Sequence, residues 1–87
     1  MSGVETLLTE TDAPPTASPE VCDVRELPPP EPLKLTLETL AEMDSDGVFV
    51  QVNDRVPQHL FPRLDDRGFA YDTVERDDRV VTAVWVE

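Results

Sequence analysis

The pattern of apolar and polar positions along residues 21–87 predicts four strands and two helices. Short runs of β-prone residues predict strands at 21–24, 48–52, 69–74 and 80–86. Apolar positions with helical spacing predict helices at about 31–43 and 57–67. Because residues 48–52 are apolar almost throughout, we expect this strand to lie inside the sheet with a neighbour on each side.

The element order β-α-β-α-β-β predicts an α/β (α+β) two-layer sandwich with a four-stranded mixed sheet and both helices on one face. The two crossovers are expected to be right-handed, and the last two strands to form an antiparallel hairpin.

Pro62 fits its helix only within the first turn. The first helix is expected to turn four side chains inward: Leu33, Leu37, Leu40 and Ala41. We expect Trp85 to be buried in the core; if it and Tyr71 face away from the helices, that face becomes a candidate interface.

Residues 1–20 have the composition of a disordered tail that precedes a domain at 21–87. They contain three prolines, many Thr and Ser, and acidic but no basic side chains. Such a segment buries too little apolar surface to offset its ordering entropy. The helical spacing of Val4, Leu7, Leu8 and Thr11 leaves open a short partner-binding helix.

The charge balance excludes several partners. The 87 residues include 19 acidic and 7 basic ones, giving a net charge of −12. DNA, RNA and anionic membranes need clustered Lys and Arg, so we expect none of them as partners. The acidity is typical of halophilic archaeal proteins, although an acidic, partly disordered mesophilic protein is the alternative. No secretory signal or ~20-residue apolar run is found, so we expect a cytoplasmic protein.

One motif resembles a known family. The stretch Cys22-Asp23-Val24-Arg25-Glu26-Leu27-Pro28-Pro29-Pro30-Glu31-Pro32 is similar to the opening of TusA/SirA-like sulfur carriers, and the resemblance covers residues 21–87. It is strongest to a cysteine-less, uncharacterised branch (a domain of unknown function) found in haloarchaea. The motif positions are Asp23, Leu27, Pro30 and Pro32, which match, and Pro29, which replaces the carrier cysteine.

This replacement implies that sulfur relay is lost, because proline cannot carry sulfur. Cys22 lies seven residues earlier, inside a predicted strand, and we expect it to be a small buried apolar residue. As the single cysteine, it can form no internal disulfide and no Cys-based zinc site.

Candidate ligand-binding residues follow the first two strands. Arg25, Asn53, Asp54 and Arg55 are expected at the carboxyl ends of parallel strands, where α/β folds bind ligands. They suggest an anion or carboxylate site, or else Arg25 pairs with Asp23 or Asp54 and ties the loops together. The cysteine-less relatives commonly carry histidine where this chain has Arg55. His59 with Asp54 makes at most a weak metal site, so we expect a surface or capping histidine.

These observations predict a small non-catalytic accessory domain that binds a protein partner. The resemblance implies a link to redox, denitrification or sulfur/metal-cofactor metabolism. We expect no enzyme activity, no cofactor, no resident metal and a monomer in isolation. The alternative is a small-ligand or cofactor-binding protein that uses the strand-end residues Arg25, Asn53 and Arg55.

Overall fold

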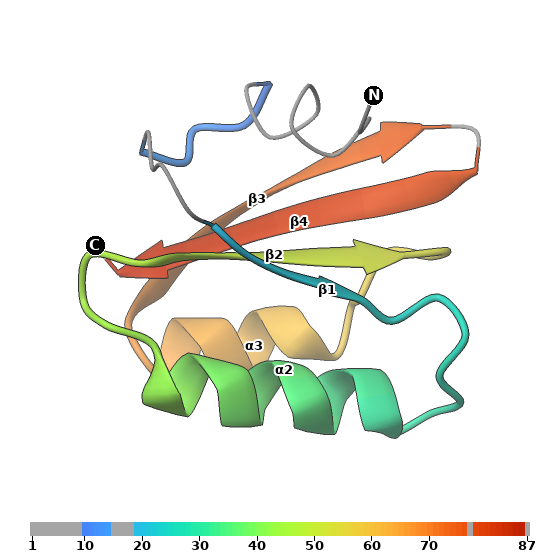
Figure 1. Cartoon of the computed structure of the whole chain (residues 1–87), viewed down its shortest axis with the longest axis horizontal. Helices are drawn as coiled ribbons and strands as arrows, with labels where there is room; N and C mark the ends of the chain where they lie inside the picture. The colour runs from blue at the N-terminus through green and yellow to red at the C-terminus, as the bar shows by residue number, and fades with distance from the viewer. Residues whose placement is uncertain (1–9, 15–18, 77, 87) are drawn as a thin grey trace.

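The computed structural model describes residues 10–14, 19–76 and 78–86. These residues form four strands and two helices in the predicted order, and Figure 1 shows how they are arranged. The elements are β1 (Glu20–Asp23), α2 (Glu31–Glu42), β2 (Val48–Asn53), α3 (Leu60–Asp66), β3 (Phe69–Arg76) and β4 (Arg79–Val86). No helix in this described part of the chain is both long and apolar enough to span a membrane.

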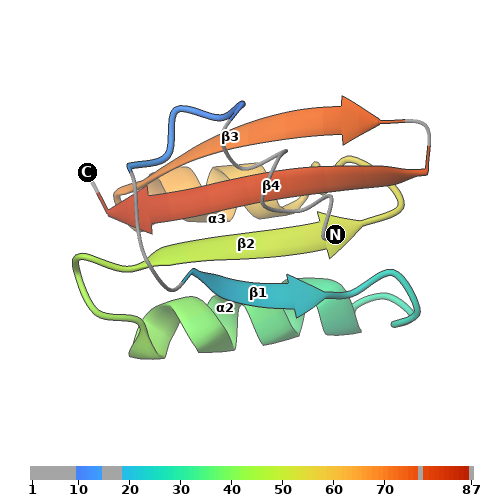
Figure 2. The same cartoon turned by 45° about the horizontal axis from the view of Figure 1, so that its top comes forward.

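The strands form one mixed sheet in the order β1-β2-β4-β3. β1 runs parallel to β2, and β4 is antiparallel to both β2 and β3. Both helices lie on one face of the sheet (Figures 1 and 2). The predicted two-layer α+β fold is therefore confirmed, as is the interior position of β2.

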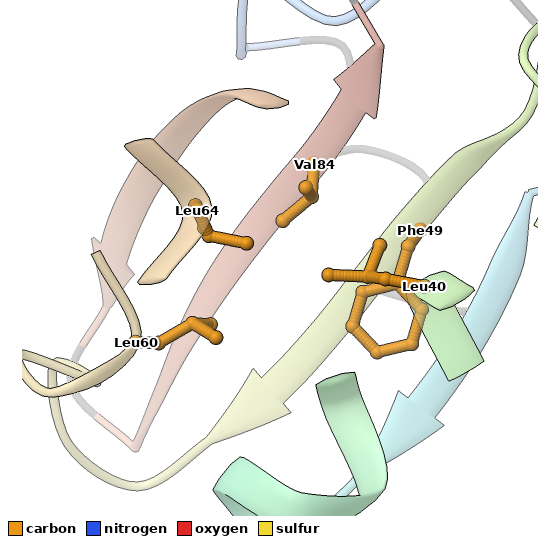
Figure 3. Close-up of a cluster of buried hydrophobic side chains, with 5 residues drawn as sticks. All are labelled: Leu40, Phe49, Leu60, Leu64 and Val84. Atoms are coloured by element: carbon orange, nitrogen blue, oxygen red, sulfur yellow. The ribbon is translucent and has the colours of Figure 1, made fainter. Parts of the chain in front are cut away.

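The core between the helices and the sheet is built from five buried side chains. Figure 3 shows this cluster, which contains Leu40, Phe49, Leu60, Leu64 and Val84. α3 begins at Leu60, three residues later than the predicted start at Pro57, and this places Pro62 in the first turn, where a missing amide does little harm. The Phe61 ring stacks on Tyr71, with ring centroids 4.9 Å apart.

The prediction for the inward side of α2 was wrong at one position. Ala41 is exposed, whereas Thr36 and Leu40 are buried and Leu33 and Leu37 are half-buried. The helix thus turns the line through Thr36 and Leu40 toward the sheet. Ala41 follows Leu40 by ~100° of helical rotation and lies beyond the edge of the contact.

The sheet face away from the helices is also apolar and largely buried. Its centre consists of Val48, Val50, Val52 and Val81, which we call the valine face. Val74 and Trp85 are partly buried against it. The expectation that Trp85 packs in the core beside the helices was therefore wrong.

The register of the hairpin explains the position of Trp85. Trp85 pairs with Ala70, whereas Val84 pairs with Tyr71. Because successive side chains of a strand point to opposite faces, Val84 and Tyr71 face the helices and Trp85 faces away. Trp85 and Tyr71 therefore lie on opposite faces of the sheet.

Part of the predicted tail contacts the sheet. Figure 1 shows residues 10–14 (blue) on the side opposite the helices. Ala13 packs against the valine face, and the Asp12 amide donates a hydrogen bond to Asp72 Oδ2 (3.0 Å). Val4, Leu7 and Leu8, which suggested a short helix, lie outside the described residues.

Candidate functional site

The candidate site lies where β1 and β2 end. The two strands are parallel, and Asp23 pairs with Val52 in register. The pairing continues past the end of β1, because the Val24 amide donates to the Val52 carbonyl (2.8 Å) and the Val24 side chain is buried. The following residues, Arg25 on one side and Asn53 to Arg55 on the other, are therefore brought to the same end of the sheet, on the right in Figure 1.

Arg25 is held by Asp23, two residues before it. Its Nε and Nη2 donate to the two oxygens of the Asp23 carboxylate (3.0 and 2.8 Å), and its backbone amide donates to the same group (3.1 Å). The hydrogen bond from Arg25 holds the pKa of the Asp23 carboxyl below its ordinary value. Pairing with Asp23 is one of the alternatives that the sequence offered for Arg25, but the pair is local to one segment and does not tie the two loops together.

Asp54 and Arg55 form a second local pair. Arg55 Nε lies 3.2 Å from Asp54 Oδ1, and the Arg55 side chain is 77% exposed. Within the described residues, no hydrogen bond or ion pair joins Arg25 to Asn53, Asp54 or Arg55. The two arginines share one end of the sheet, but each faces its own carboxylate.

Asn53 belongs to a buried chain of polar side chains rather than to the surface. Its Nδ2 donates to Gln51 Oε1 (3.2 Å), and its Oδ1 accepts the Asp54 amide (2.8 Å). Gln51 in turn donates to Thr36 Oγ1 of α2 (2.9 Å). All three side chains are nearly inaccessible to solvent. Asn53 therefore fixes the turn after β2 and links it to α2.

The start of α2 offers few amides to a ligand. Glu31 is the first helical residue, and its N–H is bonded to the Pro28 carbonyl (2.9 Å). Pro32, the next residue, has no N–H, and the Lys34 amide is bonded to the Pro30 carbonyl. The carboxylate of Glu31 also offsets the positive end of the helix dipole. This helix start is therefore a poor anion site, and the exposed Pro29 lies two residues before its first residue.

The comparisons with known proteins agree with the fold. The family described as "Uncharacterized conserved protein (DUF2249)" matches residues 21–86. The chain belongs to this family. Among solved structures, the DUF2249 domain is similar to a SirA-like protein from Desulfitobacterium hafniense, with a TM-score of 0.65 and 25% sequence identity. The match covers 77% of this chain and 97% of that protein. The comparison with curated proteins gives no match.

Cys22 of the DUF2249 domain is placed as a packing residue. It pairs with Gln51 in register and is half-buried against the core on the helix side of the sheet. Burial raises the pKa of its thiol, and the charge of Glu20 adds to this; a hydrogen bond with Thr39 acts in the opposite direction. A thiol held in this way is a weak nucleophile, because the thiolate is the reactive form.

His59 stands at the surface of the DUF2249 domain, immediately before α3. Its side chain is exposed and makes no capping hydrogen bond to the helix. In the part of the chain that the structure describes, no three His, Cys, Asp or Glu side chains are grouped so as to hold a metal ion. The structure thus places His59 at the surface and at the N-cap position of α3, where its side chain does not cap the helix.

Sequence reasoning missed two features of the DUF2249 domain. One is the buried hydrogen bond between Thr36 of α2 and Gln51 of β2. The signal that could have revealed it is that each of these polar residues lies among the apolar residues of its helix or strand. The other is a pair of arginines, Arg76 and Arg79, which stand opposite each other where β3 meets β4. The proximity of these arginines could be predicted from a hairpin with a two-residue turn, but the ion pair of Arg76 with Glu10 could not.

Proposed function

We propose that this DUF2249 domain is a non-catalytic accessory domain that binds another protein and does not relay sulfur. The observation that carries this proposal is Pro29, which stands two residues before the first residue of α2, where the resemblance to sulfur carriers places the carrier cysteine. A sulfur relay needs a thiolate at that helix start, where the dipole lowers the thiol pKa. A proline with no thiol, next to a helix start with few free amides, supplies neither requirement.

The environment of Cys22 supports the same conclusion. The thiol lies in β1 rather than at the helix start, and its pKa is raised. The proposal also includes a halophilic cytoplasmic setting, supported by the net charge of −12. A place in redox, denitrification or sulfur/metal-cofactor metabolism is supported by the resemblance alone.

The geometry favours protein binding over the alternative of a small-ligand site. An anion bound by Arg25 and Arg55 would have to displace Asp23 from the first and Asp54 from the second. Asn53 would have to leave Gln51, which would then be buried without that partner. By contrast, a protein partner needs an apolar surface. The valine face is apolar and is not covered by the two helices, and its four valines are buried in this structure.

A persulfide-loading experiment tests the loss of sulfur relay. The full chain and a Pro29→Cys variant are incubated with a persulfide donor and examined by intact mass spectrometry. We expect a gain of about 32 Da per sulfur in the variant and none in the unchanged protein, because position 29 would carry an exposed thiol, whereas Cys22 is half-buried and its pKa is raised. Sulfur that adds to Cys22 and passes on to an acceptor thiol would overturn the proposal.

A further inference from the structure

The valine face is accompanied by an intramolecular cover. Residues 10–14, which we call the strap, lie on this side of the sheet (Figure 1), and Ala13 packs against the valine face. The strap is anchored by a hydrogen bond from the Asp12 amide to Asp72 of β3 and by an ion pair between Glu10 and Arg76. Figure 2 shows the same segment beside β3 after the molecule is turned.

Two arginines mark one end of this face. Arg76 and Arg79 are directly paired across the β3–β4 ladder, and like charges in that position destabilise a sheet unless carboxylates lie nearby. Glu10 reaches Arg76. Arg79 Nε is buried and has no hydrogen-bond partner among the described residues, since Asp78 Oδ1 lies 3.6 Å away. In a chain with 19 acidic and 7 basic residues, this arginine pair is a local site for carboxylates.

The strap shows which chemistry this face accepts. It places a carboxylate on Arg76 and, three residues later, a small apolar side chain on the valines. Its anchoring ion pair is weak, because both side chains are 44% exposed. A segment held in this way is displaced readily by a competitor that makes the same contacts and a further one to Arg79.

We propose that the valine face and the Arg76–Arg79 pair form the docking surface for a peptide segment of the partner protein, and that the strap occupies this surface until the segment displaces it. The segment carries a carboxylate three residues before a small apolar residue. This proposal rests on the proposed function, of which it names the binding surface.

A competition experiment tests it with the full chain. The probe is a capped, isotope-labelled synthetic peptide with the sequence of residues 9–19, and binding is followed by the amide shifts of the peptide itself as the protein is added. Because the strap belongs to the same chain, its effective concentration at the valine face is in the millimolar range, and it therefore competes with the added peptide. A Glu10→Gln variant, which weakens the strap, should bind the peptide up to about fivefold more tightly than the unchanged chain. Glu38→Gln, an exposed change on α2, is the matched control.

A second comparison tests the role of Arg76. In the Glu10→Gln background, Arg76→Gln should weaken peptide binding by the same factor, whereas Arg63→Gln on α3 should not. The proposal is overturned if Glu10→Gln binds no better than Glu38→Gln, if Arg76→Gln and Arg63→Gln behave alike, or if no chain binds millimolar peptide. Sulfur loading of Cys22 is read separately by mass spectrometry, so failure of the proposed function is distinguishable from failure of the docking surface.

Discussion

Asp23 and Arg25 show how a single ion pair determines what the strand ends can do. The arginine guanidinium meets the carboxylate through two nitrogens, and the backbone amide of Arg25 reaches the same group. This arrangement neutralises the charge that an anionic ligand would need. The loop after β1 is therefore organised by its own residues, and its tight turn is closed by the bond from the Leu27 amide to the Val24 carbonyl (3.1 Å).

The pH dependence of stability should reveal this pair. The pKa of Asp23 is lower in the folded protein than its unfolded value of ~3.9. Its contribution to the free energy of unfolding is therefore complete above the unfolded pKa and is lost as the pH falls through the folded pKa. The carboxylate is 49% exposed, and we expect a contribution below ~1 kcal/mol. An Arg25→Gln variant should raise the Asp23 midpoint in an NMR titration of side-chain carboxyl carbons. An unchanged midpoint would contradict the assignment, and Arg63→Gln is the control.

At the scale of elements, α2 is joined to β2 by a buried hydrogen bond. Gln51 reaches Thr36 on one side and Asn53 on the other, and Asn53 holds the first amide after the strand. An unpaired buried polar group destabilises a protein by ~1–3 kcal/mol, so each member of this chain depends on the others. The chain fixes the position of the helix relative to the strand end.

Replacing Gln51 by leucine should therefore lower the free energy of unfolding by about 1–3 kcal/mol, because Thr36 and Asn53 lose a partner in the interior. Urea unfolding followed by circular dichroism measures this. Adding Thr36→Val to the Gln51→Leu variant should restore part of the lost free energy of unfolding, because it removes one buried hydroxyl that has no hydrogen-bond partner. Gln58→Leu, at an exposed position before α3, should change the free energy by less than ~0.5 kcal/mol. Equal effects of the two glutamine changes would contradict the role of Gln51.

The elements themselves were predictable because apolar spacing determines them, but the face of the sheet that each strand residue occupies was not. Both faces of β4 are apolar: Val80 and Val84 point to the helices, and Val81 and Trp85 point away. When both faces are buried, a period of two cannot show which one the helices cover. This explains the wrong placement of Trp85.

The candidate site was predictable in part for a similar reason. Parallel pairing of two strands brings their ends together, and the sequence identified those ends correctly. The sequence could not show whether the Arg25 side chain faces a ligand or pairs with Asp23, because both arrangements are compatible with the same residues at the same positions. The strap gave no signal at all, since its contacts depend on Glu10, a backbone amide and one alanine rather than on an apolar pattern.

At the scale of the whole molecule, charge repulsion opposes folding. The net charge is −12, and the ion pairs found among the described residues are few and largely exposed. Two of the three that lie entirely within the domain join residues next to each other in the chain, so they offset little of the excess. Most carboxylates therefore act on one another through solvent.

Stability should consequently increase with salt. Raising KCl from ~0.1 M to ~1 M shortens the Debye length from about 10 Å to about 3 Å, which screens the carboxylates from one another. We expect the urea midpoint at pH 7 to rise over this range. Near the sequence pI of about 4.2, where the net charge vanishes, the increase should be much smaller. A midpoint independent of KCl at pH 7 would remove the support for a halophilic setting.

The strand order has a consequence for biosynthesis. β4 lies between β2 and β3 in the sheet, yet it is the last of the strands to leave the ribosome. Until residues 79–86 emerge, β2 and β3 have no common neighbour, and the backbone N–H and C=O groups that will pair with β4 have no strand partner. We therefore expect the nascent domain to form its complete sheet late and in a single step, when β4 inserts between β2 and β3, which have been synthesised before it.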